Sequence, residues 1–328
     1  MRVIADPEER DLASTCRRIL GAECPTTLAR ALKDVGAERM PAGLWKALAD
    51  AGVLGLAIDE SLGGSGGNLS DLGVFSIEAG RALCPTVVHS TLYAARAIDW
   101  LCVPAARSAW LPLIASGAVR GTAAVSSPRD AADVAPVLDG RADSDGWRLR
   151  GVADFVADAD LADFIVVTAN AGGRALACVV ETGARGVSID PVPMMGGHRG
   201  FTVHFDDVAV DEAADVREQG IRRVANAAVA LSCLDLVGVG EAVVQRTVDY
   251  TKMRQQFGRP IASFQAAQHM VADMHIALAA ARLTAHAAVF WIGRGTATRE
   301  TAIARIRADA VKQITLNAHQ LHGGMGYV

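Results

Sequence analysis

The last third of the chain is rich in alanine and contains few residues that stop a helix, which limits the folds that it can form. Glycine releases a helical backbone and proline cannot continue it, so Gly258 and Pro260 mark the clearest break in this region. Long helices with short connections favour a bundle. The pattern predicts three bundle helices, at about residues 213–254, 264–292 and 300–321.

The two preceding regions differ from this one. Residues 1–120 read as helices, the first of which begins at Asp6-Pro7-Glu8-Glu9, with an acidic cap, a proline and carboxylates in the first turn. Residues 121–212 carry short β-type runs separated by Gly, Asp and Pro, typical of a small β-barrel or sandwich. The predicted class is α+β, with an N-terminal helical domain (1–120), a middle β-domain (121–212) and a C-terminal helical bundle (213–328). Further helices are expected at 44–52, 92–101 and 105–115, and strands at 122–125, 147–149, 164–168, 176–180 and 202–205.

Composition excludes several classes of protein. Of the 328 residues 51% are apolar and 21% charged, with a net charge of −4, so a large core is expected and a nucleic-acid-binding surface is not. Asp, Arg or Gly interrupts the longest apolar runs, and the N-terminus lacks the apolar core of a signal peptide. We therefore expect a cytoplasmic protein without a membrane segment.

The cysteines and histidines show no pattern of a disulfide framework or a metal site. The six cysteines are scattered without a C-x-x-C pair, so free buried thiols are expected. His319 and His322 could share a helix face, but no carboxylate or third histidine lies close in sequence, and no metal is predicted. The glycine-rich segment 62–67 lacks the Lys-Ser/Thr of a phosphate loop and reads as a turn between helices.

Two blocks of the C-terminal region carry the most specific pattern. The first is Arg254-Gln255-Gln256-Phe257-Gly258-Arg259-Pro260-Ile261, followed by Phe264-Gln265 and by His269 to Met274, and the second is Gln320 to Tyr327. They resemble the motifs R-x-x-F-G-x-P-I, F-Q-x-x-x-H-x-x-A-D-M and Q-x-x-G-G-x-G-Y of the acyl-CoA dehydrogenase family. Weaker matches in the same order, at 44–56, 60–66, 145–151 and 205–210, extend the resemblance over the whole chain.

The resemblance implies that FAD binds between the β-domain and the C-terminal bundle. In the family, the residues corresponding to Arg254, Phe257, Gln320 and Gly324 reach the diphosphate and adenosine end of an FAD held by a neighbouring subunit. The chemistry is suitable, because a guanidinium pairs with a diphosphate through two hydrogen bonds and glycine permits close approach of the backbone.

The residues expected near this chain's own flavin depart from the family pattern. The flavin loop T-E-P-x-x-G-S-D reads here as residues 126–133, where Ser126 keeps a hydroxyl and the later glycine and serine are alanines. The strand motif W-I-T reads Phe155-Val156-Ala157, which keeps an aromatic ring and loses the hydroxyl. Asn226 and Val229 replace the D-x-x-R that reaches CoA in the family; Arg222 and Arg223 lie nearby.

The family reaction needs a base that removes a proton α to a thioester carbonyl. In most members this is a glutamate beyond G-G-x-G-Y, which the sequence does not contain. Some relatives carry it on the helix before R-x-x-F-G, about where Asp235 stands, and a buried aspartate in an apolar run is costly unless it is paired or functional. Asp235 is the candidate base. A satisfied structural or subunit-contact residue is the alternative, and Glu241 is a lesser candidate on another face of the helix.

Three functional hypotheses follow. The pattern resembles one chain of the α2β2 heterotetrameric, steroid-degrading acyl-CoA dehydrogenases of actinobacteria, which act on bulky acyl-CoA thioesters. The second hypothesis is a self-sufficient homotetrameric dehydrogenase, and the third is a non-catalytic scaffold that completes a partner's FAD site. For the enzymes, the resemblance implies electron-transfer flavoprotein as the electron acceptor.

Overall fold

The computed structural model describes residues 6–31, 40–127, 133–194 and 200–326. The chain divides into two compact units, each of which joins separate parts of the sequence. One comprises Met1–Ala22, Leu72–Cys84 and Val229–Val328, and will be called the bundle unit. The other comprises Glu23–Asp71 and Pro85–Ala228, and will be called the sheet unit. The three-domain division with boundaries near 120 and 212 therefore stays a prediction.

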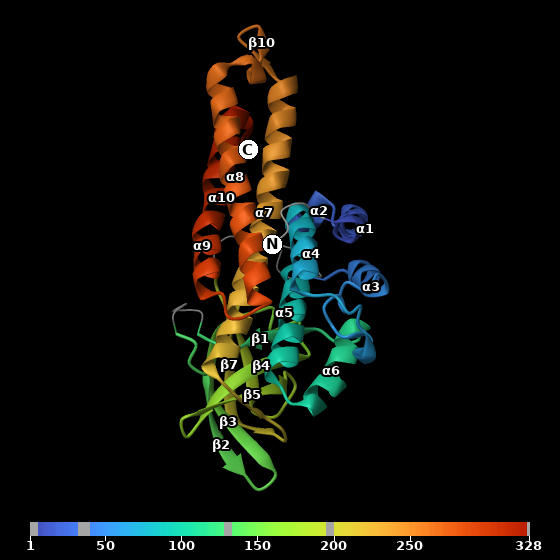
Figure 1. Ribbon diagram of the computed structural model, residues 1–328, viewed down its shortest axis with the longest axis vertical. Helices are drawn as coiled ribbons and strands as arrows, with labels where there is room; N and C mark the ends of the chain where they lie inside the picture. Colours follow the sequence, from blue (N-terminus) through green and yellow to red (C-terminus); the bar gives the residue numbers. More distant parts are fainter. Residues whose placement is uncertain (1–5, 32–39, 128–132, 195–199, 327–328) are drawn as a thin grey trace. The chain divides into compact units, whose positions relative to one another are not determined.

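The bundle unit consists of helices (Figure 1). These are α1 (Pro7–Glu23), α4 (Leu69–Ala82), the greater part of α7 (Glu218–Met253), α8 (Gln265–Ile292), α9 (Thr298–Ala308) and α10 (Ala310–His322), with the short hairpin β9 (Gln255–Gln256) and β10 (Arg259–Pro260) and the 3-10 turns η3 (Ile261–Ser263) and η4 (Gly323–Gly326). The predicted start of α1 is confirmed as a capping box, in which the amides of Asp6 and Glu9 each donate to the other's carboxylate. The third bundle helix was predicted as continuous, but a turn at Asp309 divides it into α9 and α10.

The sheet unit combines helices with one eight-stranded sheet. The helices are α2 (Thr26–Ala31), α3 (Ala42–Asp50), η1 (Glu60–Leu62), α5 (Thr86–Leu101) and α6 (Pro104–Ala115). The strands are β1 (Gly121–Ala124), β2 (Leu138–Asp143), β3 (Gly146–Ala157), β4 (Phe164–Ala171), β5 (Arg174–Glu181), β6 (Val187–Val192), β7 (Gly200–Val210) and β8 (Ala214–Val216), in the order β6-β7-β3-β2-β4-β5-β8, with β1 paired to β4.

Strand β4 is the centre of the sheet unit because both of its faces are covered. Phe164 and Val166 pack into a core with α5 and α6, whereas Ile165 and Val167 face a second core with β3 and β7. Successive side chains of a strand point to opposite faces, so the apolar run of β4 fits a strand buried on both sides. The helices and strands predicted for this part of the chain are present, and β2, β6 and β8 are additional.

The predicted free thiols are confirmed. All six cysteines are free, and five of them are buried. Burial, the largest cause, raises the pKa of Cys16 to about 12 and that of Cys233 to about 11. Because the thiolate is the nucleophile, these two groups are unreactive near neutral pH.

Helices α7 and α8 are long and apolar enough to cross a membrane by length and composition alone. The expectation that Asp, Arg or Gly interrupts the longest apolar runs before they could span a bilayer was therefore too strict. Core helices of soluble proteins meet the same criterion, and in this chain α7, α8 and α10 share one apolar core, which is composed of Val237, Val244, Ala267, Met274, Leu278, Ala281, Ile314, Ala318 and Leu321.

Helices α4 and α7 approach each other through glycine. A methyl group on Gly80 of α4 would overlap the backbone oxygen of Asp235, and one on Gly238 of α7 would overlap the backbone oxygen of Ile77. The two backbones therefore touch where a side chain would separate them. This contact fixes the position of α7 in the bundle unit.

We expect Gly80→Ala to lower the free energy of unfolding by about 1–3 kcal/mol, because the added methyl forces two helix backbones apart. Gly21→Ala is the matched control: Gly21 is exposed on α1, a methyl there meets no atom within 4 Å, and alanine favours a helix by about 0.5–1 kcal/mol. Urea denaturation of both variants measures the difference. Equal stability of the two would contradict the close approach.

Candidate functional site

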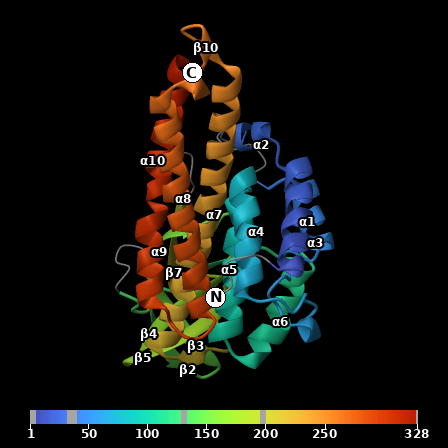
Figure 2. The same ribbon diagram turned by 45° about the horizontal axis from the view of Figure 1, so that its top comes forward.

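A cavity of about 750 Å³ lies in the bundle unit where α7 ends, α8 begins and α10 ends. Ligand pockets commonly measure about 300–1,000 Å³. The turned view in Figure 2 shows the end of α10 close to the connection between α7 and α8. The lining residues are Tyr250, Arg254, Gln256, Phe257, Ile261, Phe264, Ala266, Ala267, Met270, Gln320, Leu321, His322, Gly323, Gly324 and Met325.

A tight hairpin forms one rim of this cavity. Helix α7 ends at Met253, and β9 and β10 pair around Phe257 and Gly258, which have φ angles of 54° and 79°. Two successive positive φ angles are typical of a type I′ hairpin turn, which needs glycine at the second position. The turn leaves the Phe257 side chain 92% exposed, an unusual position for a large apolar group.

A glycine turn forms the opposite rim. Gly323 ends α10 with φ 60° and ψ −139°, a conformation that is accessible essentially only to glycine, and its amide donates to the carbonyl of Gln320. Gly324 follows with a φ outside the left-handed region, and a methyl group there would meet no atom within 4 Å. The space beside Gly324 is therefore open to a bound group.

The electrostatics of the cavity favour an anion. Among the described residues that line the cavity, Arg254 alone carries a full charge, and none is a carboxylate. Within the described part of the chain the Arg254 guanidinium forms no hydrogen bond or ion pair, although its backbone amide donates to Tyr250 at 2.8 Å. A cation without a partner beside an open glycine turn suits the diphosphate of a nucleotide.

Four of the residues predicted from the sequence thus line one cavity: Arg254, Phe257, Gln320 and Gly324. The other aromatic residues of the cavity wall were not predicted from the sequence. Phe264 lies under the Arg259 guanidinium at 4.2 Å and edge-on to Phe257 at 6.2 Å. The only available signal was position, since Phe264 belongs to the matching motif block.

Tyr250 and His322 complete the aromatic part of the wall. Their rings stack with centroids 4.3 Å apart and planes inclined by 20°. Tyr250 lies one helical turn before Arg254, and His322 directly precedes the glycine turn. Neither residue had been assigned a role from the sequence.

Ser126 and Phe155 belong to the sheet unit. Ser126 follows β1 and is half-buried. Phe155 has φ 55° at an irregularity in the pairing of β3 with β7, and its side chain is 44% exposed. Bulges often redirect a side chain next to a site, and this one presents an aromatic ring to solvent. Residues 128–132 of the expected flavin loop lie outside the described residues.

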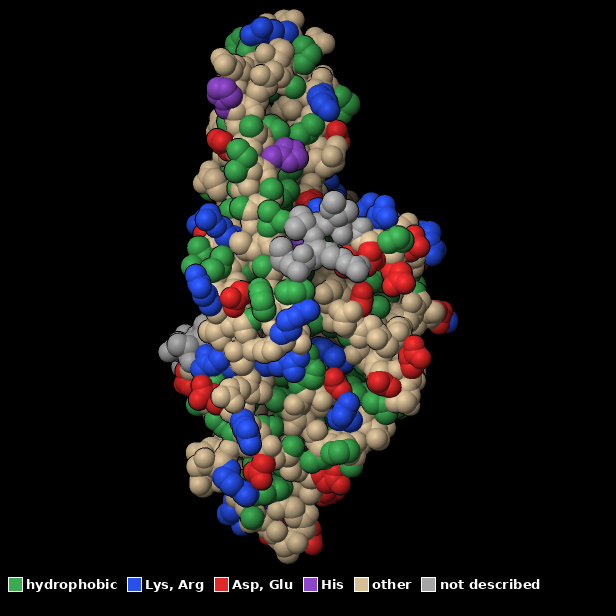
Figure 3. Space-filling view, viewed as in Figure 1, with side chains coloured by type: hydrophobic (Ala, Val, Ile, Leu, Met, Phe, Trp, Pro, Cys, Tyr) green, Lys and Arg blue, Asp and Glu red, His purple; other side chains and the backbone are tan. Residues whose placement is uncertain are grey.

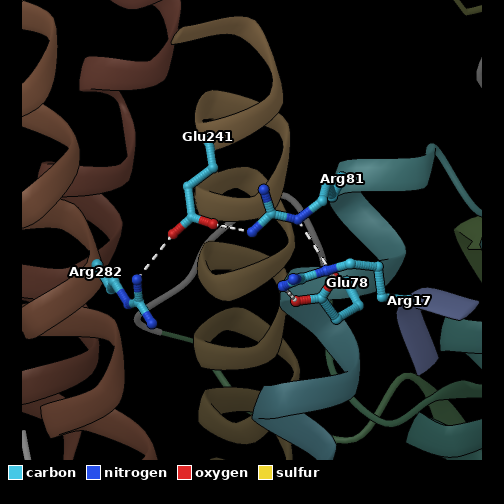
Figure 4. A network of polar contacts seen from close by, with 5 residues as sticks. All are labelled: Arg17, Glu78, Arg81, Glu241 and Arg282. Carbon is cyan, nitrogen blue, oxygen red and sulfur yellow. Dashed lines mark hydrogen bonds and ion pairs between the residues drawn. The ribbon is translucent and has the colours of Figure 1, made fainter. Parts of the chain in front are cut away.

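Asp235 and Glu241 both lie on α7, but their surroundings differ. Asp235 is half-buried between the buried residues Leu234 and Val237, at the close approach of α4. Glu241 is paired with Arg81 and Arg282 (Figure 4). Each of the two carboxylate oxygens of Glu241 accepts from one of these guanidinium groups, so Glu241 has a structural role, which argues against it as a base.

The pairing of Glu241 is part of a chain of alternating charges that joins four helices (Figure 4). Arg17 of α1 donates to Glu78 of α4 at 2.7 Å, and Arg81 contacts both Glu78 and Glu241. The chain ends at Arg282 of α8, 3.1 Å from Glu241. Glu78 is buried and Glu241 is 15% exposed, so loss of either partner leaves a poorly solvated charge. This network is structural.

Comparison with known proteins gives matches over both ends of the chain. The model of the acyl-CoA dehydrogenase N-terminal domain matches residues 6–118, and that of the C-terminal domain matches residues 221–328. Acyl-CoA dehydrogenase IpdE2 of Mycobacterium tuberculosis is 32% identical over 284 residues, which is 86% of this chain and 75% of the relative.

Two solved structures are similar over almost the whole chain. A variant of the Tcur3481-Tcur3483 steroid ACAD superposes with a TM-score of 0.87 at 29% identity, covering 97% of this chain and 88% of that one. The ChsE4-ChsE5 complex from Mycobacterium tuberculosis superposes with a TM-score of 0.90 at 25% identity, covering 100% and 90%. The predicted arrangement of helical N-terminal, central β and helical C-terminal parts is confirmed.

Proposed function

Because the chain belongs to the acyl-CoA dehydrogenase family, we propose that it is a subunit of an FAD-dependent enzyme that oxidises a bulky, steroid-derived acyl-CoA thioester between its α and β carbons. The observation that carries the proposal is the cavity at the ends of α7 and α10. Within the described part of the chain it combines one unpaired guanidinium and an open glycine turn, and its lining includes no carboxylate. The steroid-type substrate is supported by the Tcur3481-Tcur3483 relative, whose name states it.

In this proposal the cavity holds the diphosphate and adenosine end of FAD that is bound mainly by a neighbouring subunit. Arg254 pairs with the diphosphate, and the backbone of Gly324 approaches it closely. Phe257 and Gln320 border the adenosine end. Ser126 and Phe155 are proposed to contact the flavin ring held by the chain itself, through a hydroxyl and an aromatic ring. When bound, FAD supplies the acceptor for the hydride that leaves the β carbon.

Asp235 is the proposed base, whose carboxylate accepts the proton from the carbon α to the thioester carbonyl. Its half-buried place on an otherwise apolar stretch of α7 supports this role. The competing reading is a paired structural residue. Glu241, which is paired with two arginines, is not proposed for this role.

An oligomer is supported by the outer face of α8. Ile276, Leu283 and Trp291 are 69%, 44% and 49% exposed, although the opposite face of the same helix packs into the bundle core. Figure 3 shows apolar side chains on the surface of the bundle. A helix that is apolar on both faces is typically buried on both faces. We therefore propose that another subunit covers the outer face of α8.

The partner that we favour is a second acyl-CoA dehydrogenase-type chain in an α2β2 assembly. Both similar structures carry paired names, Tcur3481-Tcur3483 and ChsE4-ChsE5. A homotetramer is the alternative assembly. We propose electron-transfer flavoprotein as the electron acceptor and the cytoplasm as the location.

A second candidate function is a scaffold that completes a partner's FAD site without turnover of its own. It is favoured by the sequence departures near the flavin and CoA, where Ala131, Ala132, Asn226 and Val229 replace the residues usual in the family. In that case the cavity beside Arg254 keeps its role and Asp235 has none.

We expect Arg254→Ala to weaken FAD binding about 10- to 100-fold, because a charge-assisted hydrogen bond contributes about 1.5–3 kcal/mol. Arg254→Lys should be intermediate, since an ammonium lacks the planar pair of donors. Flavin fluorescence titration of the apoprotein measures the affinity. Arg299→Ala, at an exposed position on α9, is the control and should bind FAD like the wild type. Unchanged affinity in Arg254→Ala would refute the nucleotide site.

Substitution at the glycine turn separates folding from binding. In Gly324→Ala the methyl meets no protein atom, so the free energy of unfolding should change by less than about 0.5 kcal/mol while FAD affinity falls. Gly323→Ala should instead lose stability by about 1–2 kcal/mol, because its φ of 60° strains an L-residue. Thermal unfolding and FAD titration of both variants test this. A Gly324→Ala protein with undiminished affinity would place the phosphates elsewhere.

For the base, we expect Asp235→Asn to lower kcat about 10²- to 10⁴-fold while FAD stays bound. Glu241→Gln is the matched control on the same helix. It should keep kcat within about threefold but lose about 1–3 kcal/mol of stability, since Arg81 and Arg282 lose their shared anion. Turnover of a steroid-derived acyl-CoA with an artificial electron acceptor reports the rate. Full activity of Asp235→Asn, with FAD binding still dependent on Arg254, would favour the scaffold reading of this chain.

A further inference from the structure

The stacked pair Tyr250 and His322 joins the two rims of the cavity. Tyr250 lies on the last turn of α7, and its backbone carbonyl accepts a hydrogen bond from the amide of Arg254 at 2.8 Å. His322 is the last residue of α10, directly before Gly323 and Gly324. The ring centroids are 4.3 Å apart, and the Tyr250 hydroxyl also donates to the backbone carbonyl of His322 at 3.4 Å.

The histidine ring is itself held in place. Its Nδ1 lies 2.8 Å from the carbonyl oxygen of Ala318, one turn earlier in α10. A carbonyl only accepts, so Nδ1 carries the proton and the ring is fixed against its own helix. The orientation that allows the stack on Tyr250 is therefore set before any ligand enters.

The stacked pair is placed to control the distance between the Arg254 guanidinium and the glycine turn, the two groups that face the proposed diphosphate. Arg254 follows Tyr250 by four residues, directly after the end of α7, and the glycine turn follows His322, directly after the end of α10. The apolar core also reaches these helix ends, since Leu321 directly precedes His322 and lines the cavity. The stack and the Tyr250 hydrogen bond add a direct contact between the two rims, which lowers their conformational freedom relative to each other.

We propose that Tyr250 and His322 are positioning residues, whose stacked rings hold Arg254 and the Gly323–Gly324 turn at the separation that the diphosphate of FAD requires. This inference rests on the proposed function, since it assumes that Arg254 binds that diphosphate. Preorganisation of this kind strengthens binding because ordering is completed before the ligand arrives. The two rings act only as a pair, so removal of either should have the effect of removing both.

The test measures the FAD dissociation constant of the full chain, in the assembly in which it purifies, by flavin fluorescence. We expect Tyr250→Leu and His322→Leu each to raise it about five- to tenfold. Tyr250→Phe, which keeps the ring, should stay within about threefold of the wild type. The double variant should be no worse than either single one, which is the result for residues acting as a unit. Phe290→Leu, at an aromatic residue of α8 that does not line the cavity, is the control and should leave the affinity unchanged.

Two outcomes would overturn the inference: unchanged affinity in both leucine variants, or losses that add in the double variant. A general loss of folding would instead lower affinity in Tyr250→Phe as well, and thermal unfolding of every variant detects it. Arg254→Ala measured in parallel separates the two levels of the argument. If it weakens FAD binding and the leucine variants do not, the positioning role fails alone; if it has no effect, the nucleotide site itself fails.

Discussion

The backbone contact between α4 and α7 is the constraint on which the candidate site depends. Gly80 and Gly238 remove the side chains that would keep these helices apart, so the middle of α7 is fixed by backbone atoms. Asp235 lies at that contact, and Glu241 and Tyr250 follow on the same helix at positions determined by its rise of about 1.5 Å per residue. Arg254 comes directly after the last residue of α7, and its amide still donates to the carbonyl of Tyr250 at 2.8 Å. The helix thus sets the spacing of a candidate base and a structural carboxylate, and it places the guanidinium that we propose for the phosphates.

Two charged groups, Glu241 on α7 and Arg254 directly after its end, differ in their roles. Glu241 is neutralised by Arg81 and Arg282 and joins the helices of the bundle unit. Arg254 lies where the described residues of the cavity offer it no carboxylate. A charge with partners on neighbouring helices stabilises the fold, whereas a cation without a counter-charge beside open space is available to a ligand. The surroundings of each group, and not its residue type, distinguish the two.

The sequence predicted the large elements because their patterns are local. The start of α1 follows from the reciprocal capping of Asp6 and Glu9, and the continuous apolar run of β4 follows from burial of both its faces. Helix α4 was not predicted, because Gly73 and Gly80 read as helix breakers unless their packing against α7 is known. The break at Asp309 was missed for the opposite reason, because no glycine or proline marks the end of a helix there.

The candidate site was predictable only in part. Arg254, Phe257, Gln320 and Gly324 came from a motif, and their common cavity supports that assignment without testing what binds there. Tyr250 and His322 could not be found in this way, because their stack joins residues 72 positions apart and leaves no local pattern. The sequence indicated Phe155 because of its aromatic ring. It did not indicate the left-handed backbone of this residue, which lies at an irregularity in the strand pairing.

At some positions this chain keeps the residues that are usual in the family, and at others it has changed them. The distribution of these positions bears on how many active sites one assembly needs. The residues that we assign to a neighbour's FAD all lie in the bundle unit, whereas the altered positions Ala131 and Ala132 belong to the segment that the sequence motif predicts as the flavin loop of the chain's own site. In a homotetramer every subunit contributes both halves, so a weakened half would reduce every site. In an assembly of two chain types, one chain can keep the contribution to its partner while its own half changes. A mixed assembly therefore explains the pattern with fewer compensating changes, and it requires that the Arg254 cavity faces the partner.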